Sequence, residues 1–135
     1  MSLMESRYIA RSIRRTPEEV YRFVSEPRNM PQWAAGLAGS IERVGDEWHA
    51  QAPMGRVKIR FAPANALGVL DHDVTLESGL TVHNALRVIP NGSGSDIVFA
   101  LFRLPSVSAA EFEADAAAIA RDLETLKALL ERATP

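Results

Sequence analysis

Residues 108–132 read SAAEFEADAAAIARDLETLKALLER, and this stretch decides the fold. Apolar residues recur in it at steps of four and three, which is the spacing of one helix face: Phe112, Ala116, Ile119, Leu123, Leu126 and Leu130. Ser108 and Glu111 have the spacing of a capping box at the helix start. The stretch predicts a helix of about six turns. We expect its acidic residues, Glu111, Glu113, Asp115, Asp122 and Glu124, to form the solvated face.

The sequence before this helix predicts a meander of strands. Residues 56–61 alternate cleanly, with Val57, Ile59 and Phe61 on one face and basic residues on the other. Similar patterns predict strands at residues 8–13, 41–44, 47–52, 70–76, 81–88 and 96–104, with turns at 45–46, 78–79 and 90–94. Consecutive strands joined by short turns pair antiparallel and form one curved sheet. The long amphipathic helix is the natural cover for its apolar face.

Two short helices are predicted after the first strand. Thr16-Pro17-Glu18-Glu19 supplies an N-cap, a proline at the first helical position and a capping-box glutamate. That helix must end near Ser25, because Pro27 disfavours helical geometry before it. Residues 29–33 predict the second helix, with Pro31 near its start.

This order of elements resembles a known superfamily. The segment from Thr16 to Val24 and the spacing of Pro27, Pro31, Gln32 and Trp33 resemble the START-related helix-grip superfamily, and more narrowly its polyketide cyclase/dehydrase-like branch, SRPBCC. The resemblance covers essentially the whole chain. It implies an α+β helix-grip fold, in which a six- to seven-stranded curved antiparallel sheet wraps the long C-terminal helix and leaves a deep pocket. Members include lipid carriers, plant hormone binders, aromatase/cyclases and co-chaperone domains, so the resemblance implies a pocket and not a reaction.

The composition of the chain limits the classes of partner that it is expected to bind. The chain has 135 residues, a net charge of −2 and no cysteine. No basic block favours nucleic acid, and no apolar run approaches the roughly 20 residues that span a membrane. The missing cysteines exclude disulfides and thiolate sites and are compatible with the cytoplasm, where we expect the protein to act. We interpret residues 4–135 as one domain, with residues 1–3 as an expression scar and no signal peptide.

His72 is the main candidate for chemistry. If Leu70, Val74 and Leu76 face inward, His72 shares their face, because strand side chains alternate. A buried imidazole is a hydrogen-bonded core residue, a ligand contact or a tentative catalytic acid/base. Asn84 lies across the predicted hairpin on the same face.

Further residues are predicted to contact a ligand by the same alternation or by the helix stripe: Trp48, Ile59, Phe61, Phe99, Phe112, Ile119 and Leu123. Trp33, in the second short helix, either packs in the core or forms a wall of the pocket. Arg103 shares a face with Phe99 and either binds a carboxylate or enolate oxygen or lies exposed beyond the pocket. His83 and Arg87 fall on the opposite face of their strand, where we expect them to be solvated.

Three functions remain open. The first is the binding of a small hydrophobic or aromatic molecule between sheet and helix. The second is an enzyme of cyclase, dehydratase or isomerase type that uses His72 as acid/base. The third is a protein-interaction domain with a filled core. We expect no metal or cofactor, because His49, His72 and His83 lie on different strands and nucleotide-binding motifs are absent. A homodimer is left open.

Overall fold

The computed structural model describes residues 1–37 and 40–132, so residues 38–39 and 133–135 of the predicted domain lie outside it. The elements follow the order β1 (Ser6–Ile13), α1 (Pro17–Val24), η1 (Pro27–Asn29), α2 (Met30–Trp33), β2 (Ile41–Val44), β3 (Glu47–Ala52), β4 (Gly55–Phe61), β5 (His72–Thr75), β6 (Thr81–Asn91), β7 (Gly94–Phe102) and α3 (Ala109–Arg132). The α+β prediction is confirmed, including the long C-terminal helix and the two short helices after the first strand. The η1 turn between those helices was not predicted.

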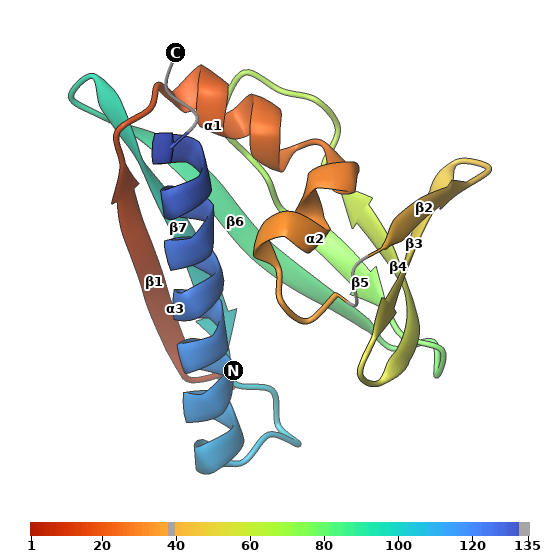
Figure 1. Ribbon diagram of the computed structural model, residues 1–135. Coiled ribbons are helices and arrows are strands. Elements are labelled where there is room, and N and C mark those ends of the chain that lie inside the picture. Colours follow the sequence, from red (N-terminus) through yellow and green to blue (C-terminus); the bar gives the residue numbers. More distant parts are fainter. Residues whose placement is uncertain (38–39, 133–135) are drawn as a thin grey trace.

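The strands form one antiparallel sheet in the order β1-β7-β6-β5-β4-β3-β2. The helices lie on one side of this sheet, which we call the inner face (Figure 1). Because paired residues in antiparallel strands point to the same face, the register assigns every strand residue to a side. The row Phe61, His72 and Asn84, for example, crosses β4, β5 and β6 on the inner face.

The capping box predicted before the first helix is present. Thr16 Oγ1 accepts a hydrogen bond from the Glu19 backbone N–H at 3.2 Å, and Glu19 Oε1 accepts one from the Thr16 backbone N–H. Val20 and Val24 of α1 are fully buried against the sheet. This cap fixes where the chain leaves β1 and turns over the inner face.

Several strand boundaries differ from the prediction. The predicted strand 70–76 shortens to β5, although the Leu70 backbone N–H still donates to Leu86 O at 2.8 Å. The predicted turn 90–94 is tighter, because Asn91 pairs with Gly94 and Gly92 adopts a φ of +60° in the turn. Pro90 fits inside β6 because β5 has already ended there, so no neighbouring strand on that side needs its missing N–H.

The helix α3 packs mainly against β1, with further contacts to β7 and α2. Its stripe is buried at Phe112, Ala116, Leu123, Leu126 and Leu130, whereas Ile119 is half-buried. The predicted stripe therefore faces the sheet along the edge strand. The middle of the inner face remains further from the helix.

Charged side chains on β1 hold α3 along this edge. Arg7 donates two hydrogen bonds to the Glu113 carboxylate at 2.6 and 2.7 Å, and Arg11 Nε donates to Glu124 Oε2 at 2.8 Å. Lys127 Nζ reaches Ser12 O. Exposed pairs of this kind stabilise weakly, but they orient the helix along one strand. The prediction that Glu113 and Glu124 are merely solvated missed these partners.

We expect Leu123→Ala to lower the free energy of unfolding by about 2–5 kcal/mol. Leu123 is 1% exposed in the core, so the truncation leaves a cavity between α3 and the sheet. Urea denaturation measures the loss. The control Leu67→Ala, at a side chain 82% exposed, should change stability by less than about 0.5 kcal/mol. A similarly small loss for Leu123→Ala would contradict this packing.

Candidate functional site

His72 lies on the inner face at the start of β5 and is 5% exposed. The Phe61 ring lies 5.0 Å from the imidazole between ring centroids, and Asn84 is its direct partner on β6. The predicted inward orientation of His72 is therefore observed. A single imidazole is placed among mainly apolar inward side chains.

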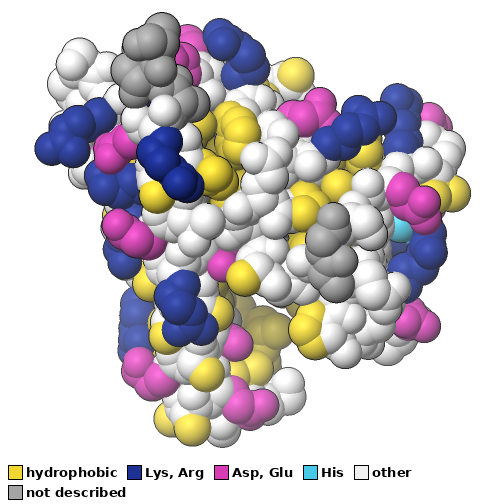
Figure 2. All heavy atoms as spheres, viewed as in Figure 1, with side chains coloured by type: hydrophobic (Ala, Val, Ile, Leu, Met, Phe, Trp, Pro, Cys, Tyr) yellow, Lys and Arg dark blue, Asp and Glu magenta, His cyan; other side chains and the backbone are white. Residues whose placement is uncertain are grey.

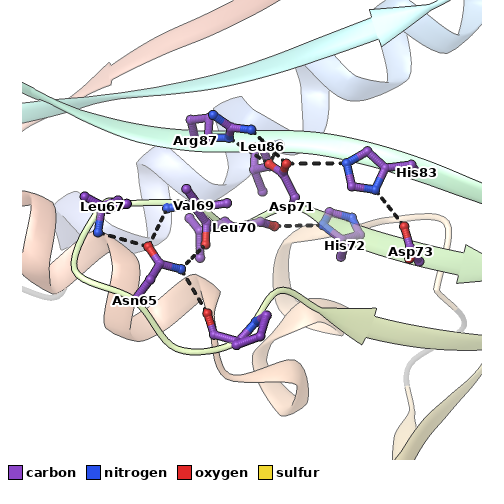
Figure 3. A network of polar contacts seen from close by, with 11 residues as sticks. Asn65, Leu67, Val69, Leu70, Asp71, His72, Asp73, His83, Leu86 and Arg87 are labelled. Atoms are coloured by element: carbon purple, nitrogen blue, oxygen red, sulfur yellow. Dashed lines mark hydrogen bonds and ion pairs between the residues drawn. The ribbon is translucent and has the colours of Figure 1, made fainter.

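The hydrogen bonding of His72 defines its tautomer. Nδ1 lies 3.1 Å from Leu70 O, and a carbonyl only accepts, so Nδ1 carries the proton (Figure 3). Burial lowers the pKa of His72 below its ordinary value, which keeps the ring neutral at pH 7. Nε2 then has a free lone pair and makes no hydrogen bond with any described residue.

Nε2 is also not sealed into the core. Within residues 1–37 and 40–132, the fully enclosed polar side-chain atom that lacks a hydrogen bond is Trp33 Nε1. Nε2 of His72 has no such bond either and is not among these enclosed atoms, so it retains some solvent access. This nitrogen is available to accept a hydrogen bond or a proton.

The neighbouring carboxylates point away from His72. Asp71 accepts two hydrogen bonds from the Arg87 guanidinium at 2.8 Å and one from the Leu86 backbone N–H at 3.0 Å. Asp73 accepts from His83 Nδ1 at 2.7 Å, on the outer face (Figure 3). His83 and Arg87 are exposed as expected, but they also pair with these carboxylates. Neither aspartate is available as a partner for the His72 ring.

The loop before β5 is anchored by Asn65. Its side chain accepts from the Leu67 and Val69 backbone N–H groups and donates to Val69 O (Figure 3). At Gly68 the loop touches β6 so closely that a Cβ atom would lie 2.2 Å from Val88 O. These contacts fix the approach to His72, and sequence reasoning assigned this loop no role. The Asn65-x-x-Gly68 spacing, which is typical of turns, was the available signal.

A hollow lies beside the N-terminal half of α3, with hydrophobic side chains visible in its depth (Figure 2). Inward residues change from buried to half-buried along the strands, from Leu86 to Asn84 on β6 and from Ile97 to Leu101 on β7. Half-buried inward side chains on the sheet and helix include Val74, Asn84, Phe99, Leu101 and Ile119. From their partial burial on the inner face we infer that these side chains border the hollow. It is open to one side, unlike the deep enclosed pocket that was expected.

Several predicted ligand residues lie elsewhere. Trp48, Ile59 and Phe61 line a separate depression of about 820 Å³, whose other walls are largely polar. The guanidinium of Arg28 covers the Trp48 ring at 4.8 Å. Phe61, one of its lining residues, also contacts the His72 ring.

Other predicted ligand residues are committed to packing. Trp33 and Leu123 are buried in the main core, and the Phe112 ring is buried beneath the Arg7 guanidinium at 5.0 Å. Arg103 donates through Nε to Val107 O at 2.8 Å and lies 3.5 Å from Glu5. Its guanidinium is thus directed to the loop before α3 and is not brought to His72.

The sequence profile of the family described as "Polyketide cyclase / dehydrase and lipid transport" matches residues 5–131. The chain belongs to this family. No curated protein matches the sequence. The family description covers both catalysis and transport, so membership supports a ligand-binding or cyclase-like chain without naming the ligand.

Solved structures with the same fold are distant in sequence. An uncharacterised protein from Bacillus thuringiensis is 15% identical, with a TM-score of 0.73 over 93% of this chain and 98% of that one. The Aha1 dimer from Colwellia psychrerythraea is 14% identical, with a TM-score of 0.74 over 98% and 100%. DynU16, from the dynemicin biosynthetic locus, is 17% identical, with a TM-score of 0.71 over 96% of this chain and 48% of that one. These likenesses show the helix-grip fold of the polyketide cyclase/dehydrase family.

One correction concerns the helix in this member of the family. Asp122 was expected on the solvated face, but it is half-buried against α2 and accepts a hydrogen bond from the Ala35 backbone N–H at 3.2 Å. Burial raises the pKa of Asp122 above its ordinary value. Asp122 directly precedes Leu123 of the stripe, so it lies close enough to the buried face to be covered.

The described part of the chain supports neither a metal site nor a membrane-spanning helix. No cluster of acidic or histidine side chains there could hold a metal ion. None of its helices is long and apolar enough to cross a membrane.

We expect Arg87→Met to make the free energy of unfolding of this protein less dependent on pH between pH 5 and 2. In the wild type, the hydrogen bonds that Arg87 donates to Asp71 lower the pKa of the Asp71 carboxyl from 3.8 to about 2. A depressed carboxylate pKa adds stability above pH 3.8, which is lost as the pH falls through about 2. At pH 7 the variant should lose roughly 1–2 kcal/mol, allowing for solvent screening of the half-exposed Arg87.

Urea midpoints between pH 2 and 7 test this expectation. The variant should lose less stability than the wild type as the pH falls from 5 to 2. Arg60→Met, at another exposed arginine on the outer face, is the matched control and should keep the wild-type profile. Parallel profiles for the wild type and Arg87→Met would contradict the role of this ion pair.

Proposed function

We propose that this chain binds one small hydrophobic or aromatic molecule in the hollow beside α3. The observation that carries the proposal is the neutral His72, whose Nε2 has a free lone pair on the apolar inner face. Such a site favours a ligand with an apolar body and one hydroxyl or N–H group that donates to Nε2. Asn84, beside His72 in register, adds an amide that both donates and accepts.

The charges near the hollow disfavour a strongly anionic ligand. Arg7 is engaged by Glu113, and Arg103 is engaged by Val107 O. A phosphate or sulfate in the hollow would find no free guanidinium from either of these side chains, and a buried unpaired charge is costly. Neutral lipids and neutral aromatic molecules fit this electrostatic environment better.

We expect saturable binding of the neutral dye Nile red to the folded protein, with displacement by a neutral aromatic competitor such as naphthol. Leu101→Arg should weaken binding at least about tenfold, because it places a charge at the border of the hollow. Phe102→Arg, one residue along and on the outer face, is the matched control and should bind as the wild type does. Fluorescence titration measures both variants.

Two outcomes would overturn the binding proposal. The first is the absence of saturable dye binding to the wild type, which would favour the interaction domain with a filled core. The second is an equal loss of binding in both variants. If Leu101→Arg does not fold, His72→Phe is measured instead. It should weaken the binding of naphthol more than the binding of a hydrocarbon of the same size. Native mass spectrometry of freshly purified protein would reveal a co-purified ligand.

The second candidate function is proton transfer in a cyclase, dehydratase or isomerase reaction. A neutral imidazole with a lowered pKa and a free Nε2 favours it, because such a group can take a proton near pH 7. The family description and the biosynthetic locus of the similar DynU16 are compatible with it. Asp71 and Asp73 are on the outer face, so His72 would act without a carboxylate partner.

The titration of His72 and His83 by NMR tests the state of this site. Burial lowers the pKa of His72, whereas the hydrogen bond to Asp73 raises the pKa of His83. The two midpoints should therefore fall on opposite sides of 6.5, the ordinary value for histidine. If the protein is an enzyme, His72→Gln should remove about 100-fold or more of the turnover, the usual contribution of a general base. If the protein only binds, the same change should alter affinity modestly.

The partners we propose are a small molecule in the hollow and a second copy of the chain. The similar Aha1 structure from Colwellia psychrerythraea is described as a dimer, which is compatible with a homodimer here. No surface for it follows from that likeness alone.

A further inference from the structure

The outer face of β1, β7 and β6 carries an uncovered apolar patch. The helices lie on the other side of the sheet (Figure 1). The register places six outward side chains together in neighbouring rows: Tyr8, Ala10, Ala85, Val98, Ala100 and Phe102. We call this set the outer apolar patch. Tyr8 is 68% exposed and Phe102 is 41% exposed, so two aromatic rings face solvent where charged side chains are usual.

The charged side chains around the outer apolar patch already have hydrogen-bond partners within the chain. Arg87, beside Val98, is bound by Asp71, and Asp96 accepts hydrogen bonds from Ser12 Oγ and Asn91 Nδ2. His83 is paired with Asp73. Covering the patch would therefore leave none of these charges without a partner, and its cost in desolvation is small.

The free edge of β1 is less suited to contact. Ile13 O faces β7, because it lies beside Gly94 there, so alternate carbonyls such as Ala10 O and Ser12 O face outward. Arg11 donates to Ala10 O, and Lys127 donates to Ser12 O. Capped edge carbonyls discourage the addition of another strand. The exposed surface in this region is therefore the face and not the edge.

We propose that the outer apolar patch is the interface at which two copies of this chain associate face to face. The patch is self-complementary: the aromatic rings Tyr8 and Phe102 project, and the alanines at 10, 85 and 100 leave room for rings of the partner. A twofold axis through the patch brings rings over alanines in both directions. The lack of unpaired charge favours an identical surface over a strongly basic or acidic partner.

The area sets the strength of this dimer. Three strands about 4.8 Å apart and a patch about 17 Å long, from Val98 to Phe102 on β7, give a projected footprint of roughly 250 Å² per copy. Side-chain relief enlarges the accessible area, but two copies still fall well below the roughly 1,200 Å² of standard interfaces. We therefore expect a weak, concentration-dependent dimer.

Sedimentation velocity from about 10 to 500 µM tests the proposal, a range chosen for weak interfaces of this size. The wild type should shift from the 14.8 kDa monomer towards twice that mass. Phe102→Arg should weaken the dimer at least about tenfold, because twofold symmetry brings two like charges together. Leu67→Arg, at an exposed leucine outside the patch, is the matched control and should dimerise normally. A wild type that stays monomeric, or a dimer that Phe102→Arg leaves intact, overturns the proposal.

Crosslinking gives an independent readout. The chain has no cysteine, so Ala100→Cys places its only thiol near the centre of the patch. A short bis-maleimide should crosslink this variant efficiently and Leu67→Cys poorly; equal yields would count against the interface. The test is separate from that of ligand binding, because Leu101→Arg should weaken dye binding and leave the dimer unchanged, whereas Phe102→Arg should weaken the dimer and leave dye binding unchanged.

Discussion

The seam between α3 and β1 governs the arrangement of the rest of the chain. Leu123, Leu126 and Leu130 supply the apolar contact, and each buried leucine contributes about 1.5–3 kcal/mol. Arg7 and Arg11 direct the helix along the edge strand by pairing with acidic residues on it. A helix placed along one edge cannot also cover the middle of a seven-stranded sheet. The short helices α1 and α2 cover only part of the inner face that α3 leaves open. The hollow in Figure 2 is the part that no helix covers.

The hollow gives His72 its chemical character. Removal of water disfavours the charged imidazole. The hydrogen bond from Nδ1 to Leu70 O determines that Nε2 is the unprotonated nitrogen. Asp71 would restore a charged ring if it faced inward, but Arg87 and the Leu86 backbone N–H hold it on the other side. The outer ion pair and the inner neutral histidine are thus two consequences of one strand alternation. A neutral acceptor in apolar surroundings suits recognition of a hydroxyl group better than recognition of a charge.

Local periodicity accounts for the parts that sequence reasoning predicted. The inward orientation of His72 and Asn84 depends only on the period of two in a strand, and the α3 stripe depends only on the helical period. The depth of the hollow depends on contacts across the chain, such as Arg7 with Glu113, which are 106 residues apart. No local pattern reveals such pairs. Arg103 illustrates the same limit, because alternation gives its face but not the loop carbonyl that occupies its guanidinium.

Register is what keeps the two faces of the sheet distinct. A slip of β5 by one residue would turn His72 outward and bring Asp71 and Asp73 into the apolar interior. Burial of unpaired carboxylates costs several kcal/mol each, so the slipped state is strongly disfavoured. Arg87 adds to this by binding Asp71 from the neighbouring strand. On β7 the same alternation separates Leu101, at the hollow, from Phe102, on the outer apolar patch. Adjacent residues therefore belong to opposite surfaces. Substitutions on one surface can leave the other unchanged, provided that the register between the strands is preserved.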